Sequence, residues 1–242
     1  ALIQMLPPTS GKGFYAYLAH GALVAVFTPA FLLPLLSVAV SLRRYWQETG
    51  GTRLQLRDVI GGLRAAANLK NLNGGQGQGC NFEYEDRYSD TRRWLHQAVM
   101  YGFLLCFAST SSGTILHYVM DIPAPYGFFS LPKLFGVPGG LLLTIGAIGL
   151  AVLKIKADPK LGAVRVWGGE MAFILLLGAT GATGLALYAA TGTVGVPLLL
   201  AIHLGSVLAL FLLLPFSKMV HGFYRLSALI VEHQKTRASR IE

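Results

Sequence analysis

The chain has 242 residues, of which 53% are hydrophobic and only 13% are charged, and its formal net charge is +9. A composition this apolar excludes an ordinary soluble domain and is typical of a membrane protein. The basic surplus needs no nucleic acid to explain it, because it lies in segments that we expect beside anionic lipid headgroups.

Charged residues are missing from four long windows: Gly13 to Leu42, Trp94 to Met120, Leu134 to Leu153 and Met171 to Ser217. A helix needs about 20 apolar residues to cross a bilayer. The last window is long enough for two spans, and Gly, Thr and Pro residues interrupt it near 191–197. We therefore predict an all-α integral membrane protein, a single membrane domain over 1–242, with five transmembrane helices at about 15–42, 94–120, 137–155, 167–190 and 198–225.

The basic residues predict the orientation of this bundle. Eighteen of the twenty Lys and Arg residues lie on alternate connections, in segments 43–93, 154–165 and 218–242. By the positive-inside rule these connections are cytoplasmic, which places the N-terminus outside and the C-terminus inside. All three tryptophans fall at the same predicted boundary, where an amphipathic ring is favoured: Trp46, Trp94 and Trp167.

The longest cytoplasmic loop, 43–93, contains a helical pattern of its own. Leucine, valine and isoleucine alternate with basic residues over 53–72, namely Arg53, Arg57, Arg64 and Lys70. This pattern predicts a helix that lies on the membrane surface or under a partner protein. The glycine-rich stretch 74–80 follows, but it lacks the Lys-Ser/Thr pair and the preceding strand of a phosphate-binding loop, so we exclude nucleotide binding.

Five of the six histidines fall into two layers of the predicted bundle. His96 and His221 lie near the inner face, and His20, His117 and His203 lie near the outer face. His203 and His221 are 18 residues apart on what reads as one apolar helix, which corresponds to five turns and about 27 Å, so both should face the same way. The sixth, His233, lies in the polar tail, where we expect it to be solvated.

Paired imidazoles in two layers favour two b-type haems over structural hydrogen bonding. We expect His96 and His221 to hold the inner haem. The outer haem needs two of three candidates, and we favour His117 with His203; His20 is the third candidate, or a donor to a haem propionate, or part of a quinone pocket. Cys80 and Cys106 form no cluster, so any iron–sulfur centre belongs to another chain.

The fourth helix carries two further features. Gly178, Gly181 and Gly184, with Thr180 and Thr183 between them, predict a surface that another backbone or a flat macrocycle can approach closely. Glu170 lies near the inner boundary, where it either pairs with Arg165 or a loop arginine, which we favour, or relays protons to a quinone. A haem-free membrane anchor or a proton-conducting subunit that uses the same histidines is the alternative to a cytochrome.

Two families resemble this chain. The predicted fifth helix, from His203 to His221, resembles the corresponding helix in the gamma subunit of respiratory nitrate reductase, which is a dihaem cytochrome b. Nearly the whole chain resembles the membrane part of the citrate/tricarballylate utilisation protein B family. The resemblance to this second family lies in Phe14-Tyr15-Ala16 with His20, Arg43-Arg44-Tyr45-Trp46, the glycine run ending at Cys80, Arg92-Arg93-Trp94-Leu95-His96, the segment from Tyr101 to Thr110, and Pro123-Ala124-Pro125-Tyr126.

This second resemblance implies an electron-transfer subunit of the bacterial inner (plasma) membrane rather than a stand-alone enzyme. It implies electrons taken from a cytoplasmic iron–sulfur or flavoprotein partner and passed to the quinone pool. Members of the family usually begin with a cysteine-rich iron–sulfur region and a further helix, neither of which occurs in these 242 residues. We expect those parts on a separate subunit or on a longer form of the chain.

Overall fold

The computed structural model describes residues 17–68, 82–83, 87–88, 90–122, 124, 126–157 and 164–239. It divides into two compact units, which we describe one at a time. The first comprises Ala1–Ala30 with Trp94–Leu210, and the second comprises Phe31–Arg93 with Phe211–Glu242. The glycine-rich segment 74–80, Pro123 and Pro125 lie outside the described residues.

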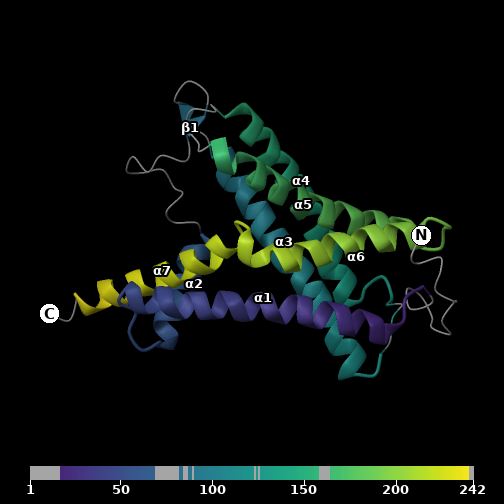
Figure 1. Cartoon of the computed structure of the whole chain (residues 1–242), viewed down its shortest axis with the longest axis horizontal. Coiled ribbons are helices and arrows are strands. Elements are labelled where there is room, and N and C mark those ends of the chain that lie inside the picture. The colour runs from purple at the N-terminus through teal and green to yellow at the C-terminus, as the bar shows by residue number, and fades with distance from the viewer. Residues whose placement is uncertain are drawn as a thin grey trace. The chain divides into compact units, whose positions relative to one another are not determined.

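Helices dominate the fold (Figure 1). Five of the described helices are long and apolar enough to cross a membrane, which confirms the predicted five-span helical fold. The side of the membrane that each end faces stays a prediction. The helices are α1 (His20–Glu48), α2 (Leu56–Ala67), α3 (Thr91–Tyr118), α4 (Leu131–Lys156), α5 (Val164–Ala189), α6 (Val196–Leu213) and α7 (Val220–Ala238), and a short antiparallel pair is formed by β1 (Phe82–Glu83) and β2 (Arg87–Tyr88).

The prediction of one helix over 198–225 is wrong. Helix α6 ends at Leu213, a 3-10 turn follows over Leu214–Phe216, and α7 begins at Val220. Pro215 lies in this turn; it has no amide hydrogen to donate, and its ring clashes with the preceding turn of an α-helix. The expectation that His203 and His221 face the same way assumed one uninterrupted helix, so the reason for it is lost.

Helix α4 forms the core of the first unit. Leu143 is only 1% exposed and packs with Leu177 of α5 and Leu210 of α6. Glycines bring the neighbouring backbones close: a Cβ added at Gly139 would lie 2.9 Å from the backbone nitrogen of Cys106 in α3, and one at Gly181 would lie 3.1 Å from the carbonyl oxygen of Gly140. Small residues are what close helix packing in a membrane requires, because lipid supplies no hydrophobic force between helices.

The outer surfaces of the spanning helices are apolar. Large side chains such as Leu33, Ile145 and Leu198 are 65%, 61% and 67% exposed. Exposed apolar surface of this extent is unfavourable in water and is satisfied by lipid. The structure therefore agrees with the composition in making this a multi-pass membrane protein.

The second unit contains α2 packed beside α7 (Figure 1). At their contact Asp58 is completely buried; Arg237 donates to its Oδ2 at 2.9 Å, and His233 donates from Nδ1 to its Oδ1 at 3.1 Å. The expectation of a solvated His233 holds only in part, because 43% of its side chain is exposed but its ring is paired with Asp58. Its partner lies 175 residues earlier in the chain, in a loop helix whose depth of burial the sequence pattern did not predict.

Candidate functional site

His203 on α6 is oriented by two consecutive residues of α5. The Thr183 hydroxyl donates to the carbonyl of Ala179 at 2.7 Å, and its oxygen lies 3.1 Å from Nδ1 of His203. Because that hydroxyl proton is already used, we infer that His203 carries its proton on Nδ1 and donates it to Thr183. The lone pair of this imidazole is then on Nε2, the atom that a metal ion would bind.

Gly184 leaves the space that this imidazole needs. A Cβ added at Gly184 would lie 3.0 Å from Cε1 of His203, which is tighter than ordinary van der Waals contact. The predicted small-residue face of α5 therefore has two parts: Gly178 and Gly181 pack against α4, and Gly184 accepts a histidine side chain.

His20 and His117 lie together. Their ring centroids are 4.7 Å apart with the planes tilted by 39°, and Nε2 of His20 shares a 2.5 Å hydrogen bond with the hydroxyl of Tyr118. His20 opens α1, whereas His117 and Tyr118 close α3. The structure thus brings two of the three candidates for the predicted outer layer into contact, while the favoured pairing of His117 with His203 stays a prediction.

The two candidates of the predicted inner layer lie in different units. His221 is an exposed residue in the first turn of α7, and its Nδ1–H donates to the carbonyl of Lys218, which again leaves the lone pair on Nε2. His96 is half-buried near the start of α3. Their pairing stays a prediction from the sequence.

Glu170 forms an ion pair with Lys154 of α4, and both side chains are about four-fifths buried, with 21% and 18% of their surface exposed. Lys154 also lies 5.8 Å from the ring centroid of Trp167. The expected structural pair at Glu170 thus exists with a different cation. Arg165 lies in the first turn of α5, but its side chain is outside the described residues.

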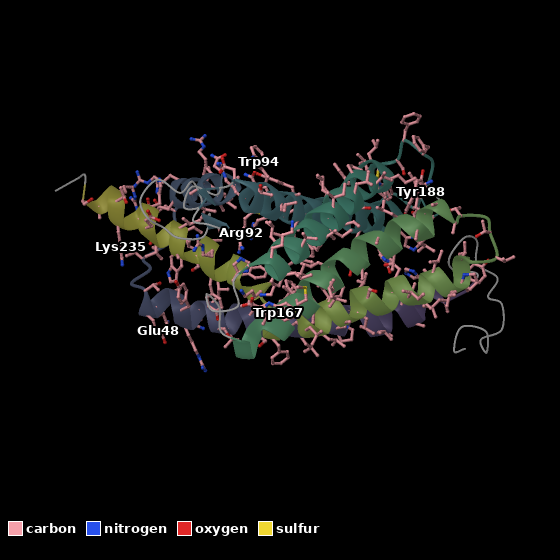
Figure 2. All side chains as sticks on the ribbon, turned by 90° about the horizontal axis from the view of Figure 1, so that it is seen from above. Glu48, Arg92, Trp94, Trp167, Tyr188 and Lys235 are labelled. Atoms are coloured by element: carbon pink, nitrogen blue, oxygen red, sulfur yellow. The ribbon has the colours of Figure 1, made fainter. Side chains whose placement is uncertain are left out.

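A similar contact lies at the other end of the same helix pair, where Lys133 is 5.2 Å from the ring centroid of Tyr188. Trp167 and Tyr188 lie towards opposite ends of α5 (Figure 2). The two lysines are 21 residues apart on α4, about 32 Å at the helical rise, which is close to the thickness of the hydrocarbon core. Lysine and aromatic side chains favour the two interfaces of a bilayer, so these contacts mark where α4 and α5 enter and leave it.

The donor types among the described residues are those that a haem with two histidine ligands requires. Among the described residues no group of three or more His, Cys, Asp and Glu side chains could hold a metal ion. A bis-histidine haem needs only two protein nitrogens, because the porphyrin supplies the other four ligands. His203, with a fixed tautomer and a neutral hydroxyl behind it, is the described side chain that fits this role best.

Two residues that shape these sites, Tyr118 and Lys154, were not predicted from the sequence, and Thr183 was predicted only as part of a small-residue surface. A weak signal existed for Tyr118, which directly follows His117, and for Thr183, which directly precedes a glycine. None existed for the pairing of Lys154 with Glu170, because the two lie on different helices and only the packing of α4 against α5 brings them together.

Comparisons with known proteins agree with this membrane architecture. Residues 3–242 match the family model described as Citrate utilization protein B. The chain is 39% identical over 224 residues to Citrate utilization protein B of Escherichia coli; the match covers 93% of this chain and 59% of that protein. No solved structure matches the chain.

Proposed function

Since the chain belongs to the citrate utilisation protein B family, we propose that it is a dihaem membrane cytochrome b subunit. In this role it transfers electrons between a cytoplasmic iron–sulfur or flavoprotein partner and the membrane quinone pool. The chain spans 59% of the length of its Escherichia coli relative.

The observation that carries this proposal is the environment of His203. An imidazole on a membrane-spanning helix is costly unless it is used. Here one residue, Thr183, fixes the tautomer, and the next, Gly184, provides the space. A purely structural histidine needs a hydrogen-bond partner but no particular orientation of Nε2, so the combination favours a ligand.

The remaining histidines supply the other ligands in this proposal. His117 partners His203, and His20 lies beside His117 to orient it through their ring contact or to replace it. His96 and His221 hold the second haem. When bound, haem supplies reversible one-electron chemistry. The task of the protein is to fix the imidazoles and to keep them away from water.

Quinone exchange has a separate structural support. A groove of about 230 Å³ runs between the first turns of α1 and the middle of α6, and its lining is almost wholly apolar, with Leu18, Val26 and Leu208 among its residues. The isoprenoid chain of a quinone is apolar, so a groove with an apolar lining suits it. Glu170 is held by Lys154, which favours a structural role for it over proton relay.

The test is to purify the protein from bacterial inner membranes and to record reduced-minus-oxidised spectra before and after adding a quinone analogue. We expect a haem b signal that dithionite generates and that the oxidised quinone analogue abolishes. A haem-free protein would instead support the membrane anchor or proton-conducting subunit. A haem signal that quinone leaves unchanged would reject the proposed exchange with the quinone pool.

A further inference from the structure

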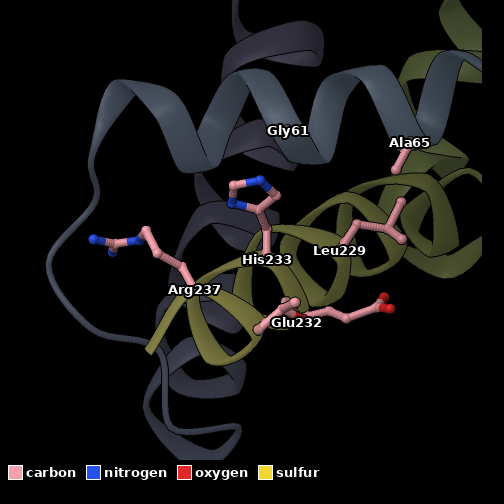
Figure 3. A pocket seen from close by; sticks show the side chains of 7 residues that line it. Gly61, Ala65, Leu229, Glu232, His233 and Arg237 are labelled. Atoms are coloured by element: carbon pink, nitrogen blue, oxygen red, sulfur yellow. The ribbon is translucent and has the colours of Figure 1, made fainter. Parts of the chain in front are cut away.

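The second unit contains a helix, α2, that packs against α7 on one side and carries large exposed apolar side chains on the other. Four residues of α2 face α7: Asp58, Gly61, Gly62 and Ala65. A Cβ added at Gly62 would lie 3.2 Å from the backbone nitrogen of Ile230, and Figure 3 shows Gly61 and Ala65 beside side chains of α7. The buried Asp58 and its partners lock this face in place.

The opposite face of α2 is apolar and exposed. Leu56, Ile60 and Leu63 recur every three or four residues, so they form one ridge. Their exposed fractions are 76%, 50% and 49%, and Leu54, just before the helix, is 59% exposed. Three large apolar side chains on two turns of a helix outside the spans are unfavourable in water. Such a patch marks a surface that contacts lipid or another protein.

Arginines border this ridge. At 100° per residue, Arg57 and Arg64 share one side of the helix, between the apolar ridge and the face that packs on α7. Both are exposed. An apolar strip with guanidinium groups along its edge is the pattern of a helix that lies in a membrane interface, with its apolar side chains among the acyl chains and its cations on phosphate groups.

The chain itself keeps α2 at the membrane. Only seven residues, 49–55, separate it from the end of spanning helix α1, a reach of less than about 30 Å. This linker is also fixed: the backbone N–H of Thr52 donates to Oε1 of Gln234 at 3.1 Å, and Nε2 of Gln234 donates to the carbonyl of Arg53. Helix α7 in turn follows the last span after a short turn.

We propose that α2 is an interfacial helix that binds anionic phospholipid, with Leu56, Ile60 and Leu63 in the acyl region and Arg57 and Arg64 on the headgroups. The short tether and the arginine border favour a bilayer over a protein partner, because a bilayer surface is always within reach of α2. This inference requires the membrane spans but not the haems.

Site-directed spin labelling tests the apolar face. In a cysteine-free chain (Cys80→Ser, Cys106→Ser), single cysteines at Leu56, Ile60 and Leu63 are labelled and the protein is placed in nanodiscs of phosphatidylcholine and phosphatidylglycerol. We expect collisions with oxygen, which concentrates in lipid, and protection from a water-soluble nickel chelate. A label at Lys235, exposed on α7, is the comparison position. Nickel-accessible labels on the α2 ridge would overturn the proposal and favour a protein partner for this face.

Spin-labelled lipids test the preference for negative headgroups. A basic residue near the surface contributes about fivefold to the attraction of anionic lipid. We therefore expect Arg57→Gln with Arg64→Gln to lower the binding of phosphatidylglycerol relative to phosphatidylcholine, by up to about 25-fold at sites on α2. The matched control is Arg57→Lys with Arg64→Lys, which keeps both charges and should keep the preference. An equal loss in the lysine and glutamine pairs, or no loss in the glutamine pair, would overturn the proposed site.

Discussion

Among the histidines that are held by their Nδ1 atoms, His203 and His233 differ in the chemistry of the group that holds them. Within the first unit, His203 donates to the neutral hydroxyl of Thr183. Within the second unit, His233 donates to the buried carboxylate of Asp58, which Arg237 also binds. One imidazole is oriented by a partner that carries no charge, and the other is part of an ion-paired cluster.

The difference separates a candidate ligand from a structural residue. Thr183 fixes the tautomer of His203, so the Nε2 lone pair of His203 can be used by another group. In the second unit, the hydrogen bonds from His233 and Arg237 to Asp58 join α7 to α2. His233 also packs against Gly61, because a Cβ there would lie 2.6 Å from its Nε2. We infer a ligand in the first case and a helix contact in the second.

Replacing His203 or His233 by alanine should give the largest difference in haem content between two variants. His203→Ala removes an iron ligand, so haem content per chain should fall by about half. His233→Ala should keep both haems, because it changes only the contact between α2 and α7. Haem is measured by the pyridine haemochromogen method. Retention of both haems in His203→Ala would reject His203 as a ligand.

Asp58→Asn should release α2 without any loss of haem. The substitution keeps the shape of the side chain but leaves Arg237 beside a neutral amide in a buried site, which is strongly unfavourable. We expect amide hydrogen exchange in α2 to accelerate on the order of tenfold or more. The control, Glu232→Gln, removes an exposed carboxylate of α7 and should leave exchange unchanged. Unchanged exchange in Asp58→Asn would mean that this cluster does not hold α2.

Gly184→Val should displace His203. The added Cβ would crowd Cε1 at 3.0 Å, and overpacking of this kind costs about 1–3 kcal/mol. We expect weaker haem retention during purification. Gly205→Ala on α6, where an added Cβ meets nothing within 4 Å, is the control. Equal haem content in both variants would contradict the close contact of Gly184 with a ligand.

Thr183→Val should weaken haem binding less than loss of the ligand itself. Removing the group that orients a metal-bound histidine typically costs about 10–100-fold in affinity. Thr183→Ser should restore binding, because it restores the acceptor oxygen. Thr180→Val is the matched control, since that hydroxyl donates to the carbonyl of Leu176 in its own helix. Failure of serine to rescue the haem affinity would argue that packing, rather than the hydrogen bond, is what matters.

Acid should weaken the cluster of Asp58, His233 and Arg237 that joins α2 to α7. Burial raises the pKa of Asp58, but the hydrogen bond from His233 and the charge of Arg237 outweigh it, so the net pKa lies below its usual value of 3.8. A carboxyl with a lowered pKa stabilises the fold above that usual value and loses the effect as the pH falls through its folded pKa. The contact between α2 and α7 should therefore persist at pH 5 and weaken below about pH 3.8, as measured by hydrogen exchange. Weakening already at pH 5 would contradict a lowered pKa.

The sequence predicted the spans well and the contacts poorly, for physical reasons. Charge-free windows identify membrane helices because a charge in lipid is costly, and that cost is a property of each residue alone. Pro215 is present in the sequence, but the uninterrupted apolar run around it favoured the prediction of one continuous helix. The helix in fact ends just before this proline. The partners of Glu170 and His233 could not be predicted, because both come from other helices and depend on packing.

The haem content of the purified wild-type protein tests the central claim most directly. Two b-type haems per chain, measured as the pyridine haemochromogen against protein concentration, is the result that this account predicts. A protein that is folded, inserted in the membrane and devoid of haem b would contradict it, and the histidines would then be structural or proton-conducting groups.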